Sequence, residues 1–123
     1  MPADYKIDTS QRMVFSIAYG NLTDQEVYAH QDKLRNDPDF DPGFSQLVDL
    51  TNVTGVDDLP VEALYVLAEK DPFDLGSRRA FVAPHNPEYN TFRIYELLTT
   101  VRPDVVVVFK DMEDAYEFLN LES

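Results

Sequence analysis

The stretch AFVAPHNPEYNTFRIYELLTTVRPDVVVVF, residues 80–109, decides the fold class of this chain. It starts with an apolar run at residues 80–83 and ends with another at residues 105–109, and each run has the length of a strand. Between them, Asn86 and Pro87 have the residue types of a helix N-cap and of the first helical position. Two strands joined by a helix predict a right-handed unit in which the strands are parallel.

The residues that flank this unit indicate how the strands lie in the sheet. Residues 105–109 are apolar at every position, whereas an edge strand normally shows a polar side, so we expect helices to cover both faces of this strand. Arg78 and Arg79 precede the strand at residues 80–83, at the end of the sheet opposite the expected site. Because acidic partners are abundant, we predict that both arginines form ion pairs on the surface.

Upstream of this unit, strands and helices continue to alternate. Residues 13–19 alternate as a strand does, and a second short strand at residues 5–8 precedes them across a turn. Thr23 and Glu26 match a capping box, which predicts a helix start. The remaining predicted elements are a short strand at residues 47–50, a polar connection at residues 51–58, a helix opened by Pro60 and a last helix capped by Asp111. The sequence therefore predicts an α/β fold of order β-β-α-β-α-β-α-β-α, with a mostly parallel five-stranded sheet and one antiparallel strand.

Composition limits the classes of function. The chain has 123 residues, which fits a single domain over residues 1–123, and its formal net charge is −13. An acidic surface repels phosphates, so we expect neither a nucleic-acid partner nor binding to anionic membranes. The chain has no cysteine, which excludes disulfides and thiolate metal sites. With no recognisable signal segment and no apolar run long enough to span a membrane, the expected location is the cytoplasm.

Candidate functional residues follow the predicted strands. In an open α/β sheet, ligands bind beyond the carboxyl ends of the strands. The residues expected there are Thr51, Asn52, Thr54, Asp57, Asp58 and His85. Asp57 and Asp58 have the chemistry of a general base or of a cation site, but capping a helix is the commoner use of such a pair. We expect no metal and no cofactor, since the two histidines are far apart in the sequence.

Two further groups have alternative interpretations. His30 lies beside the apolar side of the helix that Thr23 opens, and we expect it to be a core or boundary histidine with a hydrogen-bond partner. Phe92, Tyr95 and Tyr89 lie on the helix between the strands at 80–83 and 105–109. They either pack in the core, which is the commoner use of such residues, or line a ligand pocket.

The stretch LVDLTNV at residues 47–53 resembles the strand and following loop of STAS domains, the fold of the anti-sigma-factor antagonists. The chain as a whole resembles the small bacterial SpoIIAA-like proteins, a STAS-like group related in fold to the CRAL-TRIO lipid-binding domains. The supporting stretches are residues 22–24, 29–31, 44–50, 79–84 and 95–98. The resemblance implies a STAS-like domain and a non-enzymatic regulatory or protein-interaction module, and a small apolar-ligand or lipid carrier of the CRAL-TRIO type is the alternative.

One departure from the STAS pattern bears on regulation. In the antagonists the loop leads to an Asp-Ser pair whose serine a partner kinase phosphorylates, and the matching pair here is Asp57 and Asp58. A carboxylate cannot accept that phosphate, although its fixed negative charge weakly imitates one. An enzyme using Asp57, Asp58 and His85 is a third hypothesis. A homodimer stays open, because nothing in the sequence specifies an interface.

Overall fold

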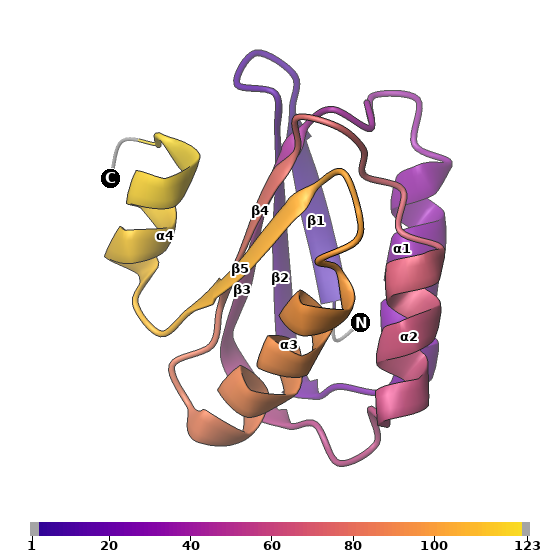
Figure 1. Ribbon diagram of the computed structural model, residues 1–123, viewed down its shortest axis with the longest axis vertical. Coiled ribbons are helices and arrows are strands. Elements are labelled where there is room, and N and C mark those ends of the chain that lie inside the picture. Colours follow the sequence, from indigo (N-terminus) through magenta and orange to yellow (C-terminus); the bar gives the residue numbers. More distant parts are fainter. Residues whose placement is uncertain (1–2, 122–123) are drawn as a thin grey trace.

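The sheet has the strand order β1-β2-β3-β4-β5 in the computed structural model, which describes residues 3–121 (Figure 1). The strands are β1 (Ala3–Asp8), β2 (Met13–Asn21), β3 (Ser45–Gly55), β4 (Arg78–Val82) and β5 (Val105–Phe109). The β1–β2 pair is antiparallel, and the other neighbouring pairs are parallel. The predicted mixed sheet is therefore confirmed. Residues 1, 2, 122 and 123, which the predicted domain also includes, lie outside the described residues.

Helices cover both faces of this sheet. They are α1 (Asp24–Arg35), α2 (Val61–Glu69), α3 (Asn86–Leu98) and α4 (Met112–Leu119), in the predicted order. The first three pack on one face and α4 packs on the other (Figure 1). Successive residues of β4 pack on opposite faces of the sheet: Phe81 packs toward α3, while Ala80 and Val82 pack toward α4. A strand covered on both faces is apolar at successive positions, which explains the uninterrupted run at residues 80–83.

Strand β5 is covered on both faces, as predicted, but it forms an edge of the sheet. The prediction assumed that an edge strand must turn one face to solvent, whereas α3 and α4 contact β5 from opposite sides. Val105 is the exception and is half exposed. The free edge is also blocked, because the Val108 N–H donates a hydrogen bond of 2.7 Å to Glu96 Oε1 of α3. This carboxylate occupies a donor that another strand would otherwise bind.

Strand β3 is longer than predicted. The expected strand at residues 47–50 is present but extends from Ser45 to Gly55. The expected polar connection at residues 51–58 is therefore wrong over residues 51–55, where Thr51, Asn52 and Thr54 belong to β3. The end of β2 supplies the pairing, with Tyr19 opposite Asn52, and the register shifts nearby. The polar residues at the end of β3 adopt a strand conformation because the end of β2 is also extended and pairs with them. No local sequence pattern reveals this pairing.

The helix starts follow the predicted capping chemistry at two of four places. At α1, the Thr23 hydroxyl accepts from the Glu26 N–H and the Glu26 carboxylate accepts from the Thr23 N–H, so the capping box is confirmed. Asp111 caps α4, as predicted. The N-cap of α3 is His85, one residue before the predicted Asn86. At α2 the N-cap is Pro60, so Asp57 and Asp58 do not cap this helix.

Candidate functional site

The predicted site residues reach the surface near the carboxyl ends of β3 and β4. Thr51, Asn52, Thr54, Asp57, Asp58 and His85 are all exposed. The Asp58 carboxylate accepts a hydrogen bond of 2.8 Å from the Asn21 side-chain amide, which ties the end of β2 to the turn before α2. Among the hydrogen bonds and ion pairs within residues 3–121, none joins His85 to Asp57 or Asp58.

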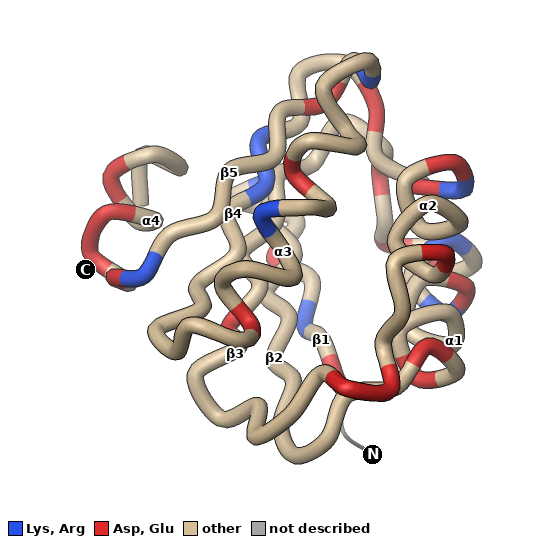
Figure 2. Tube along the Cα trace, turned by 60° about the horizontal axis from the view of Figure 1, so that its bottom comes forward, with Lys and Arg blue, Asp and Glu red and all other residues tan. Residues whose placement is uncertain are grey.

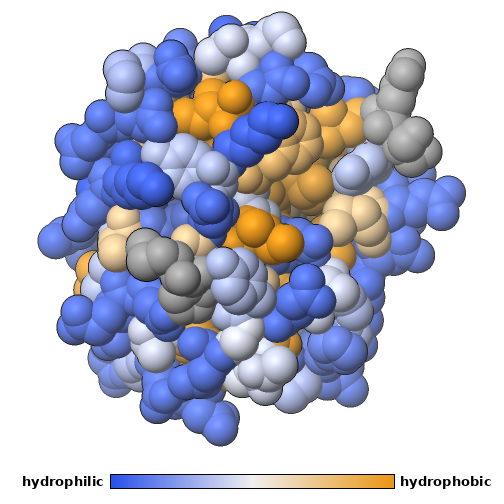
Figure 3. All heavy atoms as spheres, turned by 180° about the vertical axis from the view of Figure 1, so that it is seen from behind, coloured by the Kyte–Doolittle hydropathy of each residue, from blue (hydrophilic) through white to orange (hydrophobic). Residues whose placement is uncertain are grey.

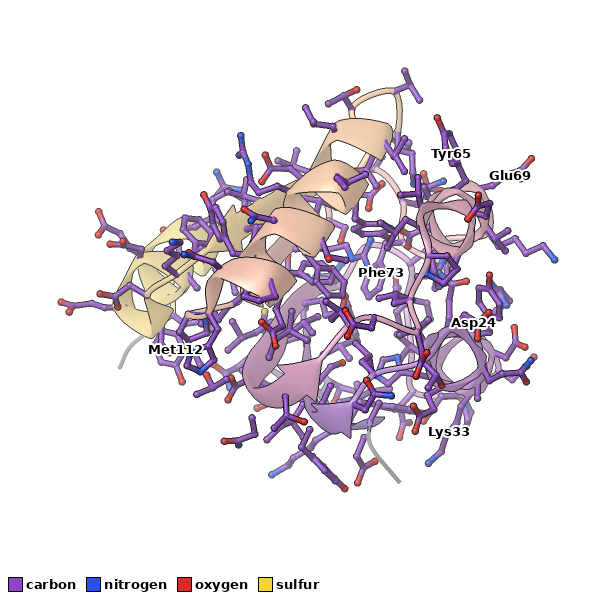
Figure 4. The ribbon with its side chains drawn as sticks, turned by 90° about the horizontal axis from the view of Figure 1, so that it is seen from below. Asp24, Lys33, Tyr65, Glu69, Phe73 and Met112 are labelled. Carbon is purple, nitrogen blue, oxygen red and sulfur yellow. The ribbon has the colours of Figure 1, made fainter. Side chains whose placement is uncertain are left out.

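A cavity of about 80 Å³ lies between the sheet and the three helices α1, α2 and α3. Its wall is mainly apolar and draws on all three helices, on four strands and on the segment after α2. Phe73 belongs to that segment and lies in the interior between α2 and the sheet (Figure 4). The principal apolar wall residues are Ala18, Leu22, Val27, Leu34, Val48, Leu50, Leu67, Phe73, Phe81 and Phe92.

One end of this cavity is polar and is built around the guanidinium group of Arg79. Arg79 is only 5% exposed, so the prediction of a surface ion pair is wrong for this residue. Arg78 is exposed as predicted, but within residues 3–121 it forms no ion pair and instead donates to the Phe118 carbonyl at 3.0 Å. It stands two residues before Phe81 on β4, and both side chains line the cavity. Its Nη1 donates to the Asp71 and Asp104 carboxylates and, at 3.1 Å, to the Tyr95 hydroxyl. Its Nε donates to Gln46 Oε1 at 3.0 Å.

A second arginine completes the charge balance behind this end of the cavity. Arg102 Nε donates to Asp104 Oδ1 at 2.9 Å, and its Nη2 donates to the Phe73 carbonyl at 2.6 Å. Two guanidinium groups therefore face two fully buried carboxylates. Burial lowers the pKa of Arg79, but the Tyr95, Asp71 and Asp104 side chains outweigh it, so that its net pKa is raised. The group stays charged and paired, which a buried charge requires.

Three polar groups at this end keep hydrogen-bonding capacity. Ser16 Oγ accepts from Gln46 Nε2 at 3.0 Å, and its hydroxyl hydrogen has no acceptor among the described residues. Arg79 Nη2 likewise donates to no group within residues 3–121. His30 Nε2 is buried and has no hydrogen-bond partner in the same part of the chain. We call Ser16, His30, Gln46 and Arg79 the polar end of the cavity.

The partner expected for His30 is not found. Its ring contacts the ring of Tyr5 edge-on, with the centroids 5.4 Å apart, and Nε2 is left without a hydrogen bond among the described residues. Burial, together with the positive charge of Arg79, lowers the pKa of His30 to about 4. The imidazole is therefore neutral near pH 7. The neighbouring Gln31 is satisfied, since its Nε2 donates to the Leu67 carbonyl at 3.0 Å.

The aromatic residues of α3 pack in the core, as the commoner of the two interpretations predicted, and whether they line a ligand pocket stays a prediction. Phe92 and Tyr95 are buried in the core and also line the cavity. Tyr95 joins the polar network by donating to Asp71 Oδ2 at 2.8 Å, and its pKa is raised, chiefly because the hydroxyl is buried. Tyr89 instead lies half-buried beneath the Lys110 ammonium group, 4.8 Å from its ring centroid.

The outer surfaces show a second depression. An open groove of about 360 Å³ lies on the α4 face of the sheet, where Phe15, Ile17, Leu47, Met112 and Tyr116 form most of its wall. Apolar side chains reach the surface on this side of the molecule (Figure 3). Acidic residues are spread over helices and loops and form no single block (Figure 2).

Residues 3–121 contain neither a metal-binding cluster nor a membrane-spanning helix. In that range, no group of three or more His, Asp or Glu side chains is arranged to hold a metal ion. Over the same range, no helix combines the length and apolar character needed to cross a bilayer.

Comparison with known proteins supports the fold. No protein-family profile matches the chain, and no curated protein matches it. A solved structure that does match is an uncharacterised protein of the DUF3478 family from Shewanella loihica PV-4, described as having a SpoIIAA-like fold. The TM-score is 0.58 at 20% identity, covering 95% of this chain and 93% of that chain. The chain therefore has a SpoIIAA-like fold, as its sequence predicted.

Proposed function

We propose that this protein is a non-enzymatic binding module that holds a small, mainly apolar molecule in the cavity between the sheet and helices α1–α3. The observation that carries the proposal is an apolar cavity with a polar end in which His30 Nε2 is buried without a partner. Buried polar atoms in proteins are nearly always hydrogen-bonded, so an orphaned atom beside empty space suggests an occupant.

The volume sets the size of this occupant. A single water molecule needs roughly 10–15 Å³ of such space, and an engineered apolar cavity of about 150 Å³ binds benzene. The cavity of about 80 Å³ lies between these two values. Because the cavity is half open, it suits a molecule of about four to six heavy atoms whose outer part reaches the mouth, or the end of a longer one.

The energetic cost of the empty space favours the same conclusion. Protein interiors are close-packed, so apolar side chains that line a hollow lose packing contacts with one another. Ala18 lines the cavity, and a larger side chain at that position would reduce the empty volume. A fold that keeps the space open is better explained by a ligand than by packing alone.

Xenon tests this proposal as a small apolar probe. The full chain is equilibrated with xenon while the methyl resonances of Val27, Leu50 and Leu67, which line the cavity, are recorded. The proposal predicts saturable shifts of these methyl groups, and it predicts their loss in Ala18→Leu. Leu47, in the wall of the open groove beside α4, serves as the reference outside the cavity. Absence of saturable shifts at the three cavity residues would refute the proposal.

A second candidate function is a protein-interaction surface at the carboxyl ends of β2 and β3. The observation that favours it is the Asn21–Asp58 hydrogen bond, which fixes an exposed carboxylate at the position matching the antagonists' regulated serine. The partner would then present a basic face. Affinity capture from the native host compares the wild type with Asp58→Lys. A partner lost in the variant supports this surface, and a protein that binds both equally counts against it.

A further inference from the structure

We infer that the cavity ligand is a neutral molecule with an apolar body and one hydrogen-bond-accepting oxygen, for example a ketone, and that this oxygen binds at the polar end. This inference rests on the proposed ligand-binding function and names the chemical class of the ligand. It follows from which hydrogen-bonding groups are already used and from where the buried charges lie.

The free groups at the polar end are predominantly donors. Arg79 Nη2 carries two N–H groups, and a guanidinium group has no acceptor. The hydroxyl hydrogen of Ser16 is a further donor, because Ser16 Oγ already accepts from Gln46. The neutral imidazole of His30 can present Nε2 as a donor or as an acceptor, depending on its tautomer. An acceptor oxygen on the ligand therefore satisfies more of these groups than a donor would.

Charge selects against an anionic ligand. The positive charge of Arg79 is already compensated by Asp71 and Asp104, and Asp104 in turn binds Arg102. Two positive and two negative side chains sum to zero, so a carboxylate in the cavity would add an uncompensated buried charge. Such a charge is strongly unfavourable in a low-dielectric interior.

The cavity wall also selects against a cationic ligand. Asp71 and Asp104 lie behind Arg79, and neither of them is part of the wall. An ammonium group would meet Arg79 with no carboxylate beside it. The geometry leaves an uncharged ligand whose oxygen accepts from Arg79 and Ser16 and whose apolar part contacts residues such as Leu50 and Phe92.

Three ring compounds of similar size separate these possibilities: cyclopentanone, cyclopentane and cyclopropanecarboxylate. Each is titrated into the full chain while backbone and methyl NMR shifts of the cavity residues are followed. A hydrogen bond to a charged donor contributes about 1.5–3 kcal/mol, which corresponds to at least tenfold in affinity. We expect cyclopentanone to bind at least tenfold more tightly than either of the other two compounds.

The outcomes distinguish the two proposals. Tightest binding of the carboxylate, or equal binding of cyclopentane and cyclopentanone, would overturn the ligand class while leaving the cavity function in place. Failure of all three compounds, together with no xenon response, would refute the proposed function and this inference with it. Ser16→Ala adds a matched check, because it removes one donor without enlarging a side chain. The variant should weaken cyclopentanone about threefold to tenfold and leave cyclopentane unchanged, and an equal effect on both compounds would contradict the inference.

Discussion

The Tyr95 hydroxyl donates a hydrogen bond of 2.8 Å to Asp71 Oδ2, which ties α3 to the segment that follows α2. Both groups are buried, and both contact the guanidinium group of Arg79. This contact therefore holds together the elements that close one end of the cavity, because each partner comes from a different part of the chain.

Removing the Tyr95 hydroxyl should destabilise the fold. In Tyr95→Phe, Asp71 loses a donor and Arg79 loses an acceptor, and we expect the free energy of unfolding to fall by about 1–3 kcal/mol. Urea unfolding measures the change. Tyr89→Phe is the matched control, because the Tyr89 side chain is half-buried and its hydroxyl makes no hydrogen bond within the described part of the chain. Equal effects of the two substitutions would contradict the role assigned to Tyr95.

The adjacent arginines of β4, Arg78 and Arg79, should contribute very differently to the free energy of unfolding. Arg79→Met removes one of the two guanidinium groups that balance the buried Asp71 and Asp104 carboxylates, so we expect a loss of about 3–5 kcal/mol or failure to fold. Arg78 is exposed and stacks on Phe118, with its guanidinium carbon 4.9 Å from the ring centroid. We therefore expect Arg78→Met to lower the free energy of unfolding by less than about 1 kcal/mol. Chemical denaturation of both variants makes the comparison. Similar losses would show that the buried network carries little of the stability.

The stability should depend on pH through His30. Its folded pKa of about 4 lies below the ordinary histidine pKa of 6.5, so the unfolded chain binds more protons between these values. The stability is therefore highest above about pH 6.5 and falls as the pH drops toward 4, by roughly 2–3 kcal/mol from this group. Unfolding free energies at several pH values test this slope.

The variant His30→Leu should remove most of the slope between pH 6.5 and pH 4. His85→Asn is the control, because His85 is exposed and should leave the slope unchanged. If His30→Leu retained the slope of the wild type, another group would have to be responsible.

How far the sequence predicts this structure depends on whether the determining contacts are local. The Thr23–Glu26 capping box is complete within one turn, so its residues sufficed to predict it. The length of β3 depends on the end of β2, and no pattern within residues 51–55 reports that pairing. Asp57, Asp58 and His85 follow their strands as predicted, whereas Thr51, Asn52 and Thr54 lie within β3. The function of all six residues stays a prediction.

The buried polar network around Arg79 was not predicted, for a similar reason. Gln46, Asp71, Arg79, Tyr95 and Asp104 meet only after the chain has folded, and no short motif contains them. One available signal was the position of Arg79, which stands two residues before Phe81 and therefore on the same side of its strand. An arginine on the buried side of a strand needs acidic partners, which would have indicated Asp71 or Asp104 as candidates.

Filling the cavity should be tolerated better than filling a packed region. Ala18→Leu places a larger side chain where empty volume exists, so we expect the free energy of unfolding to be unchanged or to rise. Ala83 is fully buried but does not line the cavity, and Ala83→Leu should cost about 1–3 kcal/mol through overpacking. Thermal and urea unfolding measure both variants. If Ala18→Leu lowered the free energy of unfolding more than Ala83→Leu, the cavity could not accommodate the larger side chain, which would contradict the prediction.

The most direct test of the central claim locates a bound neutral ligand inside the molecule. Intermolecular nuclear Overhauser effects are recorded between cyclopentanone and the methyl groups of the full chain. The account predicts contacts to Val27, Leu50 and Leu67, which line the cavity. Contacts only to Leu47 and Met112 of the groove beside α4, or no contacts at all, would contradict it.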